Sequence, residues 1–387
     1  MTSFDMGRVP PVTFGAGRRR SDLPGVLEGL IGGKARVLLV ADAILAELGP
    51  AHEMVEDMKS AGFGVDLAAE ISGEPKEALV DALADRARIG CSAVIGLGGG
   101  AAMDAAKLVA AIAPAPEGAA HYVLSRNPFP ARGLPTIAVP TTAGTGSEVT
   151  RTSIVSTSGG LKNWYWAEEL MFDHALLDPE LTLTLPPAIT AWTGIDAVAH
   201  ALEAVTSKKS NPAGQFYGLE ALRILAETLP RAVADGADLE IRGRVQWASM
   251  IAGLALHNCN THMGHNISHA LGSLAPVHHG RATGLALEVT LPRLVLRSDG
   301  ARNYAMAARA LGGSDLPEEF IRLMRACGIE RSLPACCAPI TAEALAAQMK
   351  SSANRPMADN AACAISDADL DGFAQEMTAL ALQEAVA

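Results

Sequence analysis

The first half of the chain alternates short apolar runs with helical patterns, and this alternation limits the possible folds more than any other feature. The expected strands lie at Val12–Phe14, 36–41 (RVLLVA), 64–68, 93–97 (AVIGL) and Thr136–Pro140 (TIAVP). Helical stretches at 51–60, at 76–88 and from about residue 101 separate them. Apolar strands joined by helices predict a parallel sheet that is covered on both faces.

From about residue 187 onward, strand signals become rare and segments rich in Ala and Leu follow one another. The expected helices are 188–206, 215–234, 242–257, 267–274, 301–311, 317–327, 342–350 and one after Ser366. Ser366 and Asp369 form a capping box for the last of these helices. The predicted fold class is therefore an α/β domain with a Rossmann-like parallel sheet (residues 1–185), followed by an all-α domain (186–387). The boundary falls near residues 179–187 (PELTLTLPP).

Composition narrows the choice of partners and of cellular location. The chain has 31 basic and 42 acidic residues, and its net charge of -11 argues against nucleic acid or an anionic membrane as a partner. The six cysteines show no CxxC pairing, which is typical of a reducing cytoplasm. The N-terminus does not resemble a signal peptide, and no stretch approaches the roughly 20 apolar residues that span a bilayer. We therefore expect a soluble, cytoplasmic protein.

Two loops rich in glycine and hydroxyl residues follow successive expected strands. The first is the triplet Gly98, Gly99 and Gly100, which can bring backbone N–H groups and a helix N-terminus close to a phosphate. The second is residues 140–150 (PTTAGTGSEVT), with the hydroxyl residues Thr141, Thr142 and Thr145. Each loop alone could be an ordinary turn, and neither is a GxGxxG motif or a P-loop. Because ligands gather at the carboxyl ends of parallel strands, the two loops together favour nucleotide binding.

Histidines crowd one short part of the second half. Six of the ten lie between His257 and His279. His265 and His269 are four residues apart and share one helix face, and Asp196 and His200 have the same spacing. A carboxylate and several imidazoles can form a mixed shell for divalent iron or zinc. A single histidine is more often an ordinary core or surface residue, but two such pairs indicate a metal site.

These motifs, in this order, resemble those of the iron-containing (group III) alcohol dehydrogenase family. The resemblance runs from residues 14–17 (FGAG) to about Pro356, and the 11 residues 140–150 are its most specific part. It implies a metal-dependent, NAD-linked alcohol dehydrogenase or aldehyde reductase, which transfers hydride between nicotinamide C4 and a small alcohol or aldehyde. The first domain would then bind NAD, and the helical domain would hold the metal and the catalytic site.

The resemblance also implies roles for single residues of the helical domain. The metal ligands would be Asp196, His200, His265 and His279, and His269 beside them would relay a proton or contact the substrate. The ion would be Fe2+, with Zn2+ as the alternative, because both accept an Asp/His3 shell. The other histidines of the cluster match no ligand of the family and are expected to be hydrogen-bonded or surface residues; they are His257, His262 and His278.

In the first domain, the resemblance concerns the cofactor. Asp42 would accept the hydroxyls of the adenosine ribose and repel a 2′-phosphate, which favours NAD over NADP. Asp104 belongs to the same match as the glycine triplet, and Lys162 falls where the family has a lysine near the cofactor.

Departures from the family pattern leave the substrate open. They are Ala101 in place of a serine, Glu74 in place of an asparagine, Phe172 in place of a proline and Trp192 in place of a small residue. The aromatic stretch 163–166 includes Trp164, which could narrow a substrate pocket or simply pack in the core. Arg281 could hold an anionic group of the substrate or lie on a helix surface.

Two other classes of function remain open at this stage. One is a lyase or cyclase with the same NAD-plus-metal architecture, as in the related dehydroquinate synthases, and the other is a non-catalytic metal- or nucleotide-binding protein. We expect a homo-oligomer, a dimer, although the sequence does not determine the oligomeric state.

Overall fold

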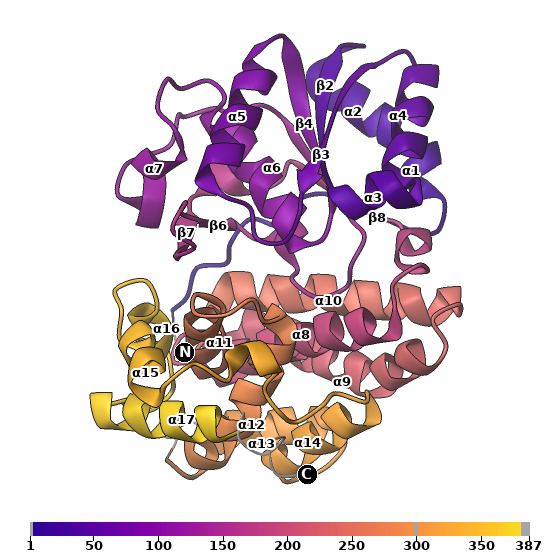
Figure 1. Cartoon of the computed structure of the whole chain (residues 1–387). Coiled ribbons are helices and arrows are strands. Elements are labelled where there is room, and N and C mark those ends of the chain that lie inside the picture. The colour runs from indigo at the N-terminus through magenta and orange to yellow at the C-terminus, as the bar shows by residue number, and fades with distance from the viewer. Residues whose placement is uncertain (1–2, 298–300, 381–387) are drawn as a thin grey trace. The chain divides into compact units, whose positions relative to one another are not determined.

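The computed structural model describes residues 3–297 and 301–380 (Figure 1). The chain divides into two compact units, one of residues 8–184 and one of residues 1–7 with 185–387. The first unit is an α/β structure with a parallel sheet, and the second consists of helices. This arrangement confirms the predicted fold class.

The first unit is built on a six-stranded sheet in which each pair of neighbouring strands runs parallel. In spatial order its strands are β1 (Val12–Phe14), β8 (His174–Leu177), β5 (Thr136–Pro140), β4 (Cys91–Gly98), β2 (Arg36–Asp42) and β3 (Gly64–Ile71). All five strands expected from the sequence are present. β8 was not predicted.

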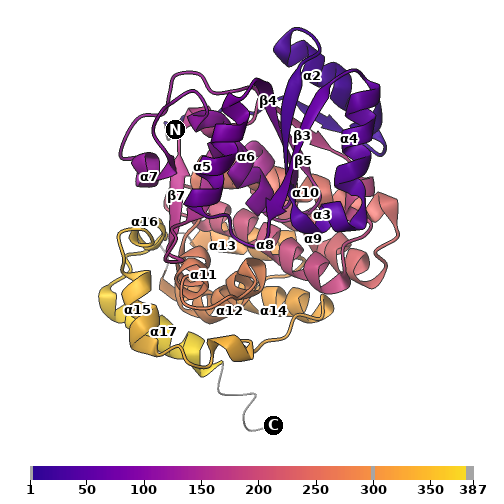
Figure 2. The ribbon, with the colours of Figure 1, turned by 45° about the horizontal axis from the view of Figure 1, so that its top comes forward.

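Helices cover both faces of this sheet, as the continuous apolar strands require. Side chains alternate along β2, so that Leu38 and Val40 join one hydrophobic cluster while Leu39 and Ala41 join the other. The first cluster includes helices α5 (Glu77–Arg88) and α6 (Gly100–Ile112), and the second includes α2 (Leu23–Ile31) and α4 (Pro50–Ser60). Figure 2 shows the two pairs of helices on opposite sides of the strands.

The order of the strands creates a switch point between β2 and β4. From β2 the chain continues to β3 on one side, whereas β4, β5 and β8 follow on the other side. Ligands of open α/β sheets bind outside the carboxyl ends of the strands at such a point. Asp42 ends β2 and Gly98 ends β4, so both predicted cofactor residues lie at this edge.

An antiparallel hairpin follows β5 and was not predicted. It consists of β6 (Thr152–Ser156) and β7 (Lys162–Trp166). The remaining short helices of this unit are α1 (Arg18–Ser21), α3 (Ala43–Leu48) and α7 (Ala119–Tyr122), with 3-10 turns at Val123–Ser125, Ser147–Val149, Glu168–Leu170 and Pro179–Thr182.

The second unit begins with three long helices, α8 (Pro187–Thr206), α9 (Pro212–Ala234) and α10 (Leu239–Cys259). They are followed by α11 (Met263–Gly272), α12 (His279–Arg297), α13 (Ala301–Leu311), α14 (Leu316–Ala326), α15 (Ala342–Met349), α16 (Arg355–Asp359) and α17 (Asp367–Ala379), with a 3-10 turn at Ala335–Cys337. The eight helices expected here are present, with ends shifted by a few residues, and the capping box of Ser366 and Asp369 is confirmed. α12 and α16 were not predicted.

α8 is the most buried of the long helices, and it packs against α9, α10 and α12. Its sequence is rich in alanine, so neighbouring helices can approach it closely. Within residues 3–297 and 301–380, no helix is both long and apolar enough to cross a membrane.

Candidate metal centre and nucleotide-binding loops

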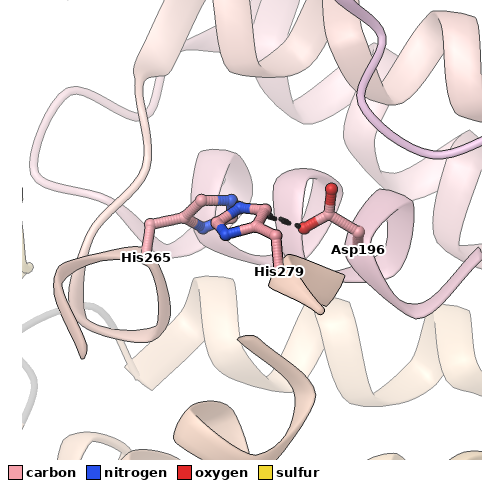
Figure 3. Close-up of side chains that lie close together, drawn as sticks. All are labelled: Asp196, His265 and His279. Carbon is pink, nitrogen blue, oxygen red and sulfur yellow. Dashed lines mark ion pairs between the residues drawn. The ribbon is translucent and has the colours of Figure 1, made fainter. Parts of the chain in front are cut away.

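Three of the predicted metal ligands meet at one point of the helical unit. Asp196 of α8, His265 of α11 and His279 of α12 each offer a ligand atom, and these atoms all lie within 4.8 Å of one another. The Oδ1 atom of Asp196 is 3.7 Å from Nε2 of His265 and 3.6 Å from Nε2 of His279. Figure 3 shows the carboxylate and the two imidazole rings converging from their three helices.

The other two predicted residues lie beside this group. His200 is one turn after Asp196 on α8, and its ring stacks on that of His265 with the centroids 4.6 Å apart. His200 is not part of the group of three. His269 is one turn after His265 on α11, and its ring is 5.2 Å from that of His279 and 6.1 Å from that of His265. The two i,i+4 pairs therefore direct their side chains toward the same region.

A glycine allows α12 to approach α8. A Cβ atom on Gly280 would lie 1.9 Å from the carbonyl oxygen of Trp192 and 3.1 Å from Cβ of Asp196. Only glycine fits here without moving the backbone, since real Cβ contacts below 3.0 Å essentially do not occur. Because Gly280 follows His279 directly, this close approach brings the imidazole of His279 to Asp196.

The protonation states at this point suit a divalent cation. Burial lowers the pKa of His265 to about 3, and the neighbouring His200 acts in the same direction, so the His265 imidazole is neutral near pH 7. Asp196 and His265 are each 3% exposed. Asp196 Oδ1 and His265 Nε2 have no hydrogen-bond partner among the described residues, although both are buried. Buried acceptors without a donor are costly unless a cation binds them, so these residues fit Fe2+ or Zn2+.

A buried carboxylate behind His265 was missed by the sequence analysis. Glu203 of α8 is fully buried, and its Oε2 atom lies 2.6 Å from Nδ1 of His265. Glu203 follows His200 by three residues and Asp196 by seven, so the three share one face of α8. An acidic residue on this apolar, alanine-rich face was the available sequence signal.

The remaining histidines of the cluster are not part of this group of three. His262 is fully buried, and its Nε2 is 2.9 Å from Oγ1 of Thr206. The ring of His278 is 5.0 Å from that of Trp192, and His257 packs against Gly7.

In the first unit, Asp42 and the glycine triplet form one turn at the switch point. The Asp42 carboxylate accepts a hydrogen bond of 2.7 Å from the backbone N–H of Gly99. Gly98 has φ of 149°, and a Cβ there would lie 2.4 Å from Oδ2 of Asp42, so glycine is required. Burial raises the pKa of Asp42, while the hydrogen bond from Gly99 opposes this shift.

The second predicted loop lies directly against the triplet. The backbone N–H of Thr141 donates to the carbonyl of Gly98 over 2.9 Å. A Cβ on Gly100 would lie 2.7 Å from the Thr145 side chain, and one on Gly99 would lie 3.5 Å from that of Thr142. The structure thus brings both loops together at the carboxyl ends of β4 and β5.

Two other predicted cofactor residues have partners within the protein. The Asp104 carboxylate accepts hydrogen bonds from the Ser147 hydroxyl (2.6 Å) and from the N–H of Ile154 (2.9 Å), so it ties α6 to the second loop and to β6. Lys162 forms an ion pair of 2.6 Å with Glu74. This pair joins the lysine that was expected near the cofactor to Glu74, a position at which the sequence departs from the family pattern.

The two predicted substrate residues occupy different units. Trp164 is half-buried in β7, where it lies opposite Ile154 of β6. Arg281 is 8% exposed and donates to the Glu330 carboxylate (2.7 Å) and to the carbonyl of Ser332 (3.0 Å). Its guanidinium is 6.0 Å from the ring of Trp192. Arg281 is thus not a surface arginine, and its charge is paired.

Comparison with known proteins matches both halves of the chain. Residues 10–179 match the family described as iron-containing alcohol dehydrogenase, and residues 190–359 match the Fe-containing alcohol dehydrogenase family, C-terminal. Long-chain-alcohol dehydrogenase 1 of Geobacillus thermodenitrificans is 33% identical over 73% of this chain and 71% of its own length. Sulfoacetaldehyde reductase of Bilophila wadsworthia is 33% identical over 75% and 74%, respectively.

Among solved structures, sulfoacetaldehyde reductase from Bifidobacterium kashiwanohense in complex with NAD+ is similar over 98% of this chain and 99% of its own, with a TM-score of 0.87 and 29% identity. A 1,3-propanediol oxidoreductase is similar over 97% and 100%, with a TM-score of 0.85 and 28% identity. The chain therefore belongs to the iron-containing alcohol dehydrogenase family and is an NAD-dependent oxidoreductase of alcohols or aldehydes.

Proposed function

We propose that the chain reduces a small aldehyde with NADH, or oxidises the corresponding alcohol with NAD+, at a divalent metal held by Asp196, His200, His265 and His279. The observation that carries this proposal is the convergence of the Asp196 carboxylate with the His265 and His279 imidazoles. It is supported by the two buried acceptors in this group, Asp196 Oδ1 and His265 Nε2, which have no donor among the described residues.

The chain's own residues would orient the substrate and move its proton. A divalent cation at this point would supply Lewis acidity, which lowers the pKa of an alcohol and polarises an aldehyde carbonyl. His269 lies beside the proposed ligands, 5.2 Å ring to ring from His279. We assign to His269 the transfer of the alcohol proton toward solvent, since a neutral imidazole is a suitable base near pH 7.

For the cofactor, we propose that the turn of Asp42 and Gly98–Gly100 takes the adenosine ribose and the pyrophosphate of NAD. The nicotinamide supplies or accepts the hydride at C4. The support is the position of Asp42 at the switch point of the sheet, beside the glycine turn. A carboxylate there would repel the 2′-phosphate of NADP. Thr141, Thr142, Thr145, Asp104 and Lys162 are proposed to shape or line this site.

The substrate class we would test first is an aldehyde that carries an anionic group. Two similar proteins are named sulfoacetaldehyde reductases, and sulfoacetaldehyde is anionic. Arg281 follows the proposed ligand His279 by two residues, and its partner Glu330 is 70% exposed in its side chain. An exposed carboxylate is a partner that a substrate anion can replace at low energetic cost. Trp164 remains proposed as a residue that narrows the pocket.

NADH absorbance tests these proposals directly. The purified enzyme, loaded with Fe2+, is mixed with NADH and with neutral or anionic aldehydes of equal length. We expect NADH oxidation that requires the metal. We also expect a higher kcat/KM for the anionic aldehyde than for the neutral one, and Arg281→Ala should remove most of this difference. Activity that persists after complete metal removal would refute the metal-dependent mechanism. Equal kcat/KM values for charged and neutral aldehydes would refute the role of Arg281.

A cytoplasmic location and a homodimer remain proposals. The location is supported by Cys91, Cys259 and Cys327, which are buried thiols without a disulfide. Size-exclusion chromatography with light scattering would determine the oligomeric state.

A further inference from the structure

We propose that Glu203 is a positioning residue that fixes the tautomer of His265 and thereby sets the metal affinity of the site. The inference rests on the proposed metal site and deepens it. It concerns a fully buried carboxylate that is not one of the group of Asp196, His265 and His279 and whose two oxygens are hydrogen-bonded to other groups.

Glu203 makes three hydrogen bonds to the segment that carries His265. Its Oε1 accepts from the backbone N–H of Gly264 (2.5 Å), and its Oε2 accepts from the backbone N–H of His262 (3.1 Å). Oε2 also lies 2.6 Å from Nδ1 of His265. Both backbone donors are orphan N–H groups at the N-terminus of α11, which is a favourable position for a carboxylate.

His262 cannot share the role of His265, although its Nδ1 is 3.3 Å from Glu203. This Nδ1 accepts a hydrogen bond from the N–H of Met263 (2.8 Å), so it carries no proton. The hydroxyl of Thr206 donates to the carbonyl of Leu202 (2.7 Å), so its oxygen accepts from Nε2–H of His262. His262 is therefore a neutral imidazole with its proton on Nε2, and burial lowers its pKa.

The proton of His265 must then lie on Nδ1. A lone pair on Nδ1 would face a carboxylate oxygen at 2.6 Å, which is repulsive, whereas Nδ1–H forms a charge-assisted hydrogen bond. The Nε2 lone pair is left free and lies 3.7 Å from Oδ1 of Asp196. This explains why Nε2 and Oδ1 have no hydrogen-bond partner: both are acceptors, and a divalent cation between them would satisfy both.

Glu203 also adjusts the charge of the buried cluster. Asp196 and Glu203 are both nearly or fully buried and together contribute two negative charges, which a divalent cation neutralises. A carboxylate hydrogen-bonded to a metal-binding histidine also makes the imidazole more basic. Removal of the charge of Glu203 should thus weaken metal binding even though Glu203 is not a ligand.

The test compares Glu203→Gln with Thr206→Val in the full-length apoenzyme. In Glu203→Gln, the side-chain amide can take two orientations. If its oxygen faces His265, its NH2 group faces the N–H of Gly264, so that two donors meet. If the amide is flipped, its NH2 group donates to Nδ1 of His265, and the proton of His265 moves to Nε2. Thr206→Val is the matched control, because it removes the partner of His262 on the same buried helix and leaves His265 untouched. Co2+ is the probe, and its visible absorption bands report binding.

We expect Glu203→Gln to weaken Co2+ binding by roughly 10- to 100-fold, as for other residues that hold a metal ligand. Thr206→Val should lower the melting temperature of the apoenzyme but leave the Co2+ affinity within about threefold of wild type, because it touches no proposed ligand. Equal Co2+ affinities in the two variants would overturn the proposal and leave Glu203 with a structural role. If Asp196→Ala and His265→Ala also bound Co2+ like wild type, the metal site itself would be wrong.

A second measurement reads the tautomer in the wild-type protein itself. In wild-type apoenzyme labelled with 15N-histidine, the ring nitrogen shifts of His265 distinguish its two tautomers, and the signal is assigned by its loss in His265→Ala. We expect a protonated Nδ1 and an unprotonated Nε2. A proton on Nε2 would refute the proposal.

Discussion

The close approach of α12 to α8 predicts a large effect of one added methyl group. Gly280→Ala would place a Cβ 1.9 Å from the carbonyl oxygen of Trp192, whereas real contacts of this kind do not fall below 3.0 Å. The obstacle is backbone and cannot rotate away. The start of α12 must therefore move by at least about 1 Å, and such overpacking typically costs about 1–3 kcal/mol.

This displacement acts directly on the metal site, because His279 precedes Gly280 and its Nε2 lies 3.6 Å from Oδ1 of Asp196. A shift of about 1 Å in a catalytic group can lower the rate by roughly 100-fold. We expect Gly280→Ala to weaken Co2+ binding to the apoenzyme and to lower kcat/KM by one to two orders of magnitude, in line with this estimate.

The matched control lies one turn further along the same helix. A Cβ on Gly284 would meet its nearest neighbour, Ile195, at 3.4 Å, which is ordinary contact. Gly284→Ala should leave metal affinity unchanged and stabilise the helix by up to about 1 kcal/mol. Wild-type metal affinity and activity in Gly280→Ala would refute the reasoning, as would equal damage in both variants.

Two further predictions concern the first unit. Asp42→Gly removes the carboxylate at the switch point and should narrow the preference for NAD over NADP in kcat/KM; a wild-type enzyme that already prefers NADP would contradict the assignment. Burial raises the pKa of Glu148 to about 7 from 4.5, so its protonated form stabilises the fold below pH 4.5, and this contribution is lost as the pH rises through 7. The melting temperature of wild type should therefore fall more steeply between pH 5 and 8 than that of Glu148→Gln. Parallel plots of melting temperature against pH for the two proteins would show that Glu148 does not cause this loss of stability.

The sheet could be predicted from sequence because its strands are buried on both faces. Apolar runs such as those of β4 and β5 have no polar face, and their lengths distinguish them from helices. The hairpin of β6 and β7 gave a weaker signal. Its strands are only five residues long and mix hydroxyl, aromatic and charged residues, and the turn between them, residues 157–161 (TSGGL), was the better indication.

Spacing along the chain predicted which histidines share a helix face, but it could not predict which faces meet. The pair His265 and His269 could be identified because both lie on α11. The contact of His265 with His279 depends on α12, a helix that was not predicted, and on the close approach at Gly280. The side-chain partner of Arg281 is likewise a tertiary feature, since Glu330 lies 49 residues away in sequence.

Glu203 could not be identified as part of the metal site from the sequence, because it is not a ligand and its partners lie on another helix. It holds two backbone N–H groups at the start of α11 and the Nδ1–H of His265 in the first turn of that helix. One buried carboxylate therefore stabilises the helix N-terminus and orients a proposed ligand on it. Once α11 has formed, the Glu203 carboxylate already lies beside His265, so folding also prepares the site for a divalent cation. In the sequence, the same residue is only a glutamate in an alanine-rich helix, and its importance arises from the partners that the fold brings to it.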